Sequence, residues 1–150
     1  MIINYKLETE LLKISDLREI LDLYETLFDS SLPTNGFLYE IENQKKILFN
    51  LAYSDNSELL GFKVGFEKKY RIFYSWLGGV KKKYRGQGIA KRLMQDQHNW
   101  LKENEYQSIT THTSNDFKEM LILNLKNGFD ITGTNINSRG EQRLILSKRL

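Results

Sequence analysis

Cysteine is absent from the 150 residues of this chain, which has only two histidines and one proline. Without cysteine the protein can form no disulfide, no thiolate zinc site and no acyl-cysteine intermediate. His98 and His112 are too few for a histidine-rich metal site, and no spacing of carboxylates predicts a site built from oxygen ligands. We therefore expect a protein that binds no metal.

Long apolar runs are also missing. No stretch approaches the ~20 apolar residues that a membrane-spanning helix needs. The first ten residues, MIINYKLETE, carry acids and no long apolar stretch, so they lack the features of a secretory signal. The composition, 40% hydrophobic and 27% charged, is that of an ordinary globular protein. We expect one cytoplasmic domain over residues 1–150 that does not bind a membrane.

Acidic residues are missing from one part of the chain. The net charge is only +3 and the pI about 9.0, but positions 81–95 hold no acid and six cations: Lys81, Lys82, Lys83, Arg85, Lys91 and Arg92. Such a stretch favours an anionic ligand nearby, and a solvated basic surface is the alternative. A basic protein could also bind nucleic acid, but no recognition-helix pattern accompanies the charge, so we expect no nucleic-acid partner.

Apolar periodicity and turn residues predict the order strand, two helices, three strands, helix, strand, helix, two strands. Strands are expected at 2–7, 47–53, 58–67, 70–80, 107–113, 129–134 and 142–150, and helices from Asp16, at 36–46, after Gly88 and at 116–126. The strand–helix–strand unit over 70–113 makes two strands parallel neighbours. The expected fold class is α/β (α+β), with a mixed, mostly antiparallel sheet of about seven strands and about four helices.

Two helix starts are predicted from capping pairs. Asp16 is followed by Glu19, and Asp116 by Glu119, at the spacing that lets both side chains satisfy exposed first-turn amides. Segment 30–36, SSLPTNG, is predicted to be a loop because it holds the one proline among small polar residues.

The segment from Arg85 to Ala90, RGQGIA, joins the end of a predicted strand to the start of a helix. The first turn of a helix has amides without partners and a positive dipole end, and glycines let a ligand approach that backbone closely. A phosphate fits such a place, and a plain surface turn is the alternative. The loop lacks the Lys-Ser/Thr pair of a P-loop, and Lys91 stands where a dinucleotide fingerprint needs Gly or Ala.

The strand before this loop contains two adjacent glycines. Gly78 and Gly79 interrupt the bulky run FYSWLGGV. Glycine inside a strand predicts a bulge or a close approach to the backbone. A bulge here would separate this strand from its parallel neighbour, and the freed backbone groups could hydrogen-bond an extended ligand.

These features together resemble the GCN5-related N-acetyltransferase (GNAT) family. Its loop pattern is Arg or Gln, two residues, Gly, one residue, then Gly or Ala, and Arg85, Gly88 and Ala90 occupy those places. The hydrophobic end of the preceding strand matches at Val80, an Asn at the head of a later helix at Asn115, and a helix-closing Gly-Phe at residues 128–129. The resemblance covers nearly the whole chain. It implies a three-layer fold with helices on both faces and with strands 4 and 5 splayed at a bulge.

The resemblance implies an acetyl-CoA-dependent N-acetyltransferase. Such an enzyme moves an acetyl group to an amine of a small molecule or peptide by direct transfer in a ternary complex. The expected partners are the co-substrate acetyl-CoA and an amine, with a homodimer as an option. The residues that would contact acetyl-CoA are Gly78, Gly79, Val80, Arg85, Gly86, Gln87, Gly88, Ile89, Ala90, Lys91, Asn115 and Asn124.

The catalytic groups are less well defined. The family often has a Glu on the strand before the loop, where this chain has Tyr74, and usually a general-acid Tyr four residues before Gly-Phe, where it has Asn124. An amide cannot give up a proton at neutral pH, so the general acid is missing or lies elsewhere. Candidate catalytic residues are Tyr74 through a water, the nearest carboxylate Glu67, and His112 on the neighbouring strand, each with a packing or solvated role as the alternative.

The missing Tyr and Glu support a second hypothesis, a domain that senses acyl-CoA without catalysis. The acceptor amine is not identified by any pattern. We expect the region 30–39 and the final strands to shape its pocket.

Overall fold

The computed structural model describes residues 1–10, 14–27 and 34–150. Seven strands form one sheet in the order β1-β2-β3-β4-β5-β7-β6. The strands are β1 (Ile3–Glu8), β2 (Leu48–Ser54), β3 (Leu59–Lys69), β4 (Ile72–Val80), β5 (Ser108–Thr113), β6 (Asp130–Ile136) and β7 (Gln142–Arg149). The helices are α1 (Ile14–Leu27), α2 (Thr34–Asn43), α3 (Ile89–Glu103) and α4 (Lys118–Lys126), with a short 3-10 turn at Lys82–Tyr84.

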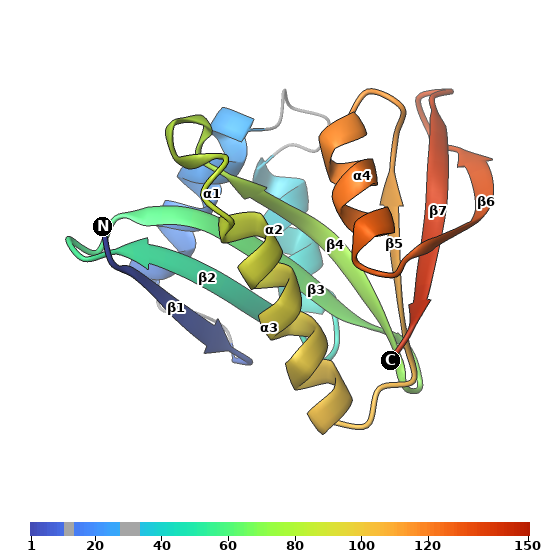
Figure 1. Cartoon of the computed structure of the whole chain (residues 1–150), viewed down its shortest axis with the longest axis horizontal. Helices are drawn as coiled ribbons and strands as arrows, with labels where there is room; N and C mark the ends of the chain where they lie inside the picture. Colours follow the sequence, from blue (N-terminus) through green and yellow to red (C-terminus); the bar gives the residue numbers. More distant parts are fainter. Residues whose placement is uncertain (11–13, 28–33) are drawn as a thin grey trace.

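The sheet has three layers with its helices, as Figure 1 shows: α1 and α2 lie behind it and α3 and α4 in front. Only β4 and β5 pair in parallel, and the other neighbours are antiparallel. The predicted mixed sheet and its parallel pair are therefore confirmed. None of the helices in the described ranges is long and apolar enough to cross a membrane.

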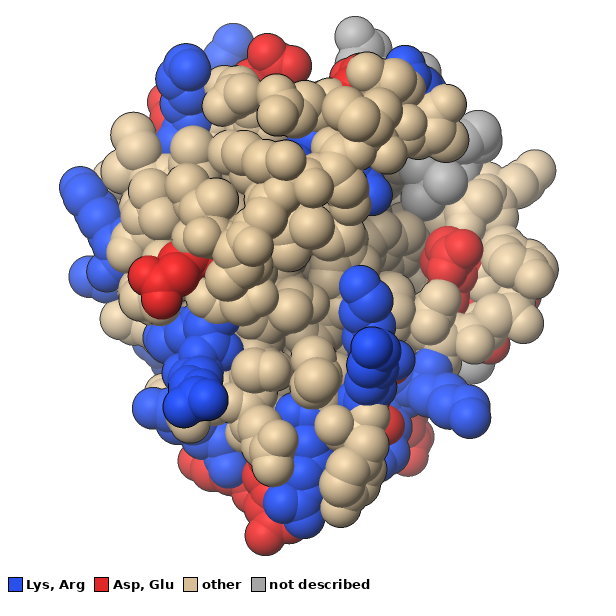
Figure 2. Space-filling model, turned by 90° about the vertical axis from the view of Figure 1, so that its right-hand side faces the viewer, with Lys and Arg blue, Asp and Glu red and all other residues tan. Residues whose placement is uncertain are grey.

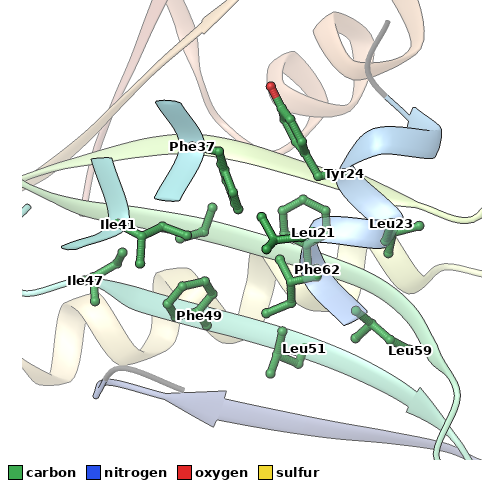
Figure 3. Packing of buried hydrophobic residues seen from close by; sticks show 12 residues of the cluster. Leu21, Leu23, Tyr24, Phe37, Ile41, Ile47, Phe49, Leu51, Leu59 and Phe62 are labelled. Carbon is green, nitrogen blue, oxygen red and sulfur yellow. The ribbon is translucent and has the colours of Figure 1, made fainter. Parts of the chain in front are cut away.

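The core on the α1–α2 face is aromatic and aliphatic. Tyr24 of α1 stacks on Phe37 of α2 with ring centroids 4.7 Å apart, and Phe37 lies 5.2 Å from the ring of Trp76 in β4. Figure 3 shows these helices pointing their side chains at Phe49 of β2 and Phe62 of β3. Burying each such side chain contributes about 1.5–3 kcal/mol, which fixes both helices on this face.

The parallel pair separates halfway along its length. Ile72–Ser75 of β4 pair with Ser108–Thr111 of β5, and no further pairs follow. Against β3, Val64 pairs with Leu77 and Gly65 with Ser75, so Trp76 is an extra residue in β4. In Figure 1 the two strands lie together at the lower end and diverge upward, with α4 in front of the gap. The predicted splay is confirmed, and we call this opening the V.

The bulge lies at Trp76 and not at the glycines. Gly78 and Gly79 pair regularly with Lys63 and Phe62. Gly79 makes room for the α1 helix, because a Cβ there would overlap the side chain of Leu27. A small residue can thus interrupt a strand for helix packing as well as for a bulge, and the sequence does not separate the two causes.

Both predicted caps are wrong in position. The described part of α1 begins at Ile14, so Asp16 lies inside the helix. Helix α4 begins at Lys118 with Phe117 as its N-cap and no side-chain cap bond, while the Asp116 amide donates to Ser114 Oγ over 3.3 Å. The predicted loop 30–36 falls partly outside the described residues, and its last part, 34–36, is the first turn of α2.

Candidate functional site

The loop after β4 carries an open, amide-rich helix start. Gly86 and Gly88 have φ of +79° and +81°, a conformation that other residues rarely adopt. Gly88 is the N-cap of α3, and no side chain caps the helix. The first helical hydrogen bond runs from Arg92 N to Gly88 O, so the amides of residues 89–91 precede it. A Cβ on either glycine would meet nothing within 4 Å, which leaves these amides accessible to an anion.

A carboxylate from the turn just before β3 holds this loop in place. Glu58 accepts from Lys81 Nζ at 2.9 Å and from the Tyr84 hydroxyl at 3.2 Å. The lysine hydrogen bond is the main reason that the pKa of Glu58 lies below its usual range. Arg85 Nε donates to the carbonyl of Val80 over 3.0 Å and so ties the loop to the end of β4. The predicted cofactor ligand Arg85 thus positions the loop, and Glu58 is an anchor that the sequence analysis missed.

Two of the six cations near the loop are engaged elsewhere. Lys81 is paired with Glu58, and Arg92 binds Asp96 at 2.9 Å and lies over the ring of Tyr5. The other members, Lys82, Lys83, Arg85 and Lys91, are exposed and have no acidic partner among the described residues. Lys82, Lys83 and Lys91 therefore remain for an anionic ligand, while Arg85 is also bonded to Val80.

The inside of the V offers backbone groups and one buried amide. Residues 76–80 of β4 have no strand partner on their β5 side within the described sheet. Asn115 is exposed just beyond the end of β5. Asn124 is the buried residue of α4, the helix in front of the gap in Figure 1. Its carbonyl accepts from Phe129 N, but no hydrogen bond is made by its side chain within the described structure. An amide that lacks a partner inside the protein suits a polar ligand group.

On the opposite face the structure brings Tyr74 and His112 together. The Tyr74 hydroxyl lies 3.3 Å from His112 Nδ1, and the two rings are 5.1 Å apart. Tyr74 also packs edge-on against Phe66, which contacts Trp76, so the pair belongs to the α1–α2 face. Burial raises the pKa of Tyr74. Burial, and then the charges of Arg143 and Lys68, lower the pKa of His112 below its ordinary 6.5. At neutral pH the pair is therefore a protonated phenol beside a neutral imidazole.

A sequence profile of the Acetyltransferase (GNAT) family matches residues 15–129. The chain belongs to this family. Solved structures share the fold of this GNAT acetyltransferase along almost its whole length. The comparison with curated proteins finds no match.

Three of these structures show the extent of the likeness. The NatC complex bound to Gag peptide and CoA contains a chain that is 19% identical, with a TM-score of 0.84 and coverage of 100% of this chain and 99% of that one. Ard1 from Thermoplasma volcanium is 18% identical, with a TM-score of 0.82 and 97% of both chains covered. The ribosomal-protein-S18-alanine N-acetyltransferase from Escherichia coli is 13% identical, with a TM-score of 0.79 and coverage of 97% and 94%. At these identities the likeness establishes the fold.

Glu67 lies away from the other two catalytic candidates of this acetyltransferase. It follows Phe66 in β3, and successive side chains of a strand point to opposite faces. Its carboxylate lies 3.6 Å from Lys46 Nζ. It also acts on Tyr106, whose pKa is raised to about 12 by burial and then by Glu67. These residues line a cavity of about 380 Å³ that does not include Tyr74 or His112. Glu67 therefore lies apart from the Tyr74–His112 pair in this structure.

A further cluster of titratable side chains lies between α3 and the sheet. His98 Nδ1 accepts from Lys148 Nζ over 3.1 Å, and burial, followed by nearby lysine charges, lowers the pKa of His98 to about 3. Burial also lowers the pKa of Lys63, which flanks Gly78, to about 8. His98 is therefore neutral at pH 7. No sequence pattern predicted this cluster, because its members come from α3, β7 and β3.

Metal ligands do not gather in the part of the chain that the structure describes. No group of three or more His, Asp or Glu side chains there could hold an ion. The groups that remain for chemistry are the open amides at α3, the buried Asn124 and the Tyr74–His112 pair.

Proposed function

We propose that this GNAT acetyltransferase moves an acetyl group from acetyl-CoA directly to an amine of a small molecule or peptide while both are bound. The observation that carries the proposal is the V. Its open end lies beside uncapped amides of α3 on one face of the sheet, and the Tyr74–His112 pair lies on the other. A cofactor and an acceptor can therefore approach the same gap from opposite sides.

The cofactor proposal uses groups that the fold leaves open. Acetyl-CoA supplies an acyl thioester, which is activated toward amines. The amides from Gln87 to Lys91 would bind its diphosphate, helped by the exposed cations Lys82 and Lys83. Backbone groups at 78–80 would pair with the pantetheine arm in the manner of an added strand. The Asn124 amide would lie near the thiol end, where it can donate a hydrogen bond but not a proton.

The acceptor proposal assigns proton transfer to Tyr74 and His112. An alkyl ammonium has a pKa near ~10.4, so only roughly one molecule in a few thousand is neutral at pH 7. When the Tyr74 hydroxyl donates to His112 Nδ1, it can pass its proton to the imidazole and take one from the amine, directly or through water. A neutral imidazole beside a protonated phenol is the arrangement that this relay needs.

A sensor that binds acyl-CoA without turnover is the second candidate. It is favoured by Asn124, which stands where the family usually has a general-acid Tyr. It is also favoured by the absence of any carboxylate partner for the Tyr74–His112 pair in the described structure. The two candidates share the cofactor site and differ only in chemistry.

One experiment separates them. Thermal unfolding is measured with and without acetyl-CoA, and a ligand at a hundred times its Kd should stabilise the protein by ~2.7 kcal/mol. Release of free CoA is then followed with a panel of amines between pH 6 and 9. Stabilisation with amine-dependent CoA release supports the transferase. Stabilisation without release at any pH supports the sensor, and no stabilisation would contradict the cofactor site.

A further inference from the structure

We propose that the acceptor carries, besides its amine, a carboxylate that Arg143 and Lys68 bind beside the Tyr74–His112 pair. The inference rests on the proposed function, because it names the class of acceptor for the same site. Four adjacent strands carry the four residues in sheet order: Lys68 on β3, Tyr74 on β4, His112 on β5 and Arg143 on β7. The two cations thus flank the pair from either side.

The strand register places Arg143 on the face of His112. His112 pairs with Ile145 across β5 and β7, and Arg143 lies two residues before Ile145. Side chains two apart in a strand share a face. Arg143 Nε donates to Asn135 Oδ1 over 3.0 Å, which fixes the side chain across the β6–β7 hairpin. The outer nitrogens of its guanidinium group remain for a ligand and have the geometry to bind a carboxylate through two hydrogen bonds.

Lys68 approaches from the opposite side of the pair. It lies two residues after Phe66, and its Nζ is 5.4 Å from the centroid of the Tyr74 ring. It is exposed, so its ammonium group can reach a bound anion while it stays close to the Tyr74 ring. A carboxylate held between Arg143 and Lys68 would place the rest of the acceptor over Tyr74 and His112.

Neither cation has an acidic partner in the part of the chain that the structure describes. Lys46, Lys81, Arg92 and Arg139 each have an acid within 4 Å. Arg143 and Lys68 have none in the described ranges, and the charges that act on His112 are both positive. A positive field of this kind attracts anionic ligands and opposes the binding of polycationic amines.

The side of the molecule formed by β6 and β7, which carries Arg143, has a partly basic surface. Figure 2 looks onto the β6–β7 side of the molecule and shows a hollow in this surface. Lys and Arg side chains gather below the hollow, and an acidic side chain lies farther to its right. An anionic acceptor that approaches this side of the molecule would meet positive charge below the hollow.

The test compares acceptors that differ only in the carboxylate. An amino acid whose amine and carboxylate are separated by several methylene groups has nearly the same amine basicity as its carboxamide, and a short peptide with an acidic side chain and an amidated end tests the second source of a carboxylate. With acetyl-CoA saturating, we expect the KM of the carboxylate compounds to be at least about tenfold lower, the size expected for a hydrogen-bonded ion pair. Arg143→Gln should remove that difference, and Arg143→Lys should restore part of it.

The matched control is Arg139→Gln. This residue is exposed in the turn of the same hairpin and is already paired with Glu141 at 3.0 Å. It makes the same change of charge, and we expect no change in KM for any acceptor.

Binding without turnover is measured as well, so that the two proposals can fail separately. The same acceptor pairs are titrated into protein saturated with CoA by calorimetry. Equal affinity for acid and carboxamide, or an equal loss of both in Arg143→Gln, would overturn the carboxylate site. If carboxylate-selective binding is seen but no amine releases CoA from acetyl-CoA, the transferase proposal fails while the carboxylate site stands.

Discussion

The two faces of the V are built from different chemistry. On the α3–α4 face, here called the cofactor side, the open groups are backbone amides at the start of α3 and the glycines Gly86 and Gly88 before it. On the α1–α2 face, here called the acceptor side, they are side chains of Lys68, Tyr74, His112 and Arg143 from four strands. A diphosphate can be bound by any exposed helix start, whereas an amine acceptor needs placed side chains. The comparison indicates that the cofactor side determines which group is transferred, whereas the side chains of the acceptor side determine which amine receives it.

The largest effect should come from a charge placed in the open loop. Gly88→Glu puts a carboxylate beside the amides that would bind the diphosphate, and we expect acetyl-CoA affinity to fall at least 100-fold, on the order of 3 kcal/mol. The measurement is acetyl-CoA titration by calorimetry. Gly140→Glu is the matched control, because Gly140 also has a positive φ, +76° against +81°, and equally open space around it.

Both variants carry the same backbone strain and the same added charge, and they differ only in position. We expect Gly140→Glu to bind acetyl-CoA normally. If Gly88→Glu binds acetyl-CoA as well as Gly140→Glu does, the cofactor side lies elsewhere.

A second prediction concerns the acceptor side. His112→Gln keeps a polar group near the Tyr74 hydroxyl but removes the imidazole, and we expect kcat to fall about 100-fold, the usual effect of losing a general base. Acetyl-CoA affinity should not change. The neutral imidazole is the active form, so wild-type activity should be lost as the pH falls through the pKa of His112, which burial holds below 6.5.

The pH profile distinguishes a chemical role from a structural one. His112→Gln should lack this acidic limb, and its residual activity should follow only the ionisation of the amine. A variant that retains the same acidic limb would show that another group provides it. Steady-state kcat measured from pH 5 to 8, with unfolding followed at each pH, separates loss of activity from loss of fold.

A third change should affect the acceptor side through the bulge. Gly65 pairs with Ser75 beside the extra residue Trp76, and a Cβ on Gly65 would overlap the Tyr74 carbonyl and the ring of Phe73. We expect Gly65→Ala to destabilise the protein by about 1–3 kcal/mol, as overpacking in a core does. Gly133→Ala is the control, since its Cβ would make an ordinary contact of 3.7 Å with Ile145.

The measurement is urea unfolding of both variants, followed by kinetics on the folded protein. Because the overlap involves the backbone of Tyr74, we expect kcat of folded Gly65→Ala to fall while acetyl-CoA affinity remains. A stability equal to that of Gly133→Ala would mean that the strands can move apart without cost at this point.

The cofactor side could be predicted from the sequence because its signal is local. The glycines, the helix start and the cations all lie within one segment, and glycine has few reasons to appear at a helix start other than a positive φ or a close approach. The element order and the parallel pair followed from strand and helix periodicity in the same way. The exact place of the bulge could not be predicted, because contact with Leu27 explains Gly79 equally well.

The acceptor side could be predicted only in part, because its members meet through the sheet. Tyr74 and His112 were candidates. Arg143 and Lys68 were not, because only the strand order β3-β4-β5-β7 brings them beside that pair. Glu67 was a candidate as the nearest carboxylate along the chain. It lies on the other face because side chains alternate along β3, where Phe66 pairs with Tyr74 and Glu67 with Phe73. Distance along the sequence is a poor guide to a site assembled across strands.

The smallest expected effect concerns Asn124, the buried side chain of α4. Asn124 is buried in α4 over the V, and within the described residues its amide has no hydrogen-bond partner. If this amide donates to the leaving thiolate, Asn124→Ala removes a single hydrogen bond, which corresponds to a fall in kcat of about 3- to 10-fold. Acetyl-CoA affinity should change little, because the diphosphate and the pantetheine arm keep their own contacts. Steady-state kinetics at saturating acceptor measure the effect. Unchanged kcat in a folded Asn124→Ala variant would show that the thiolate leaves without a hydrogen bond from α4.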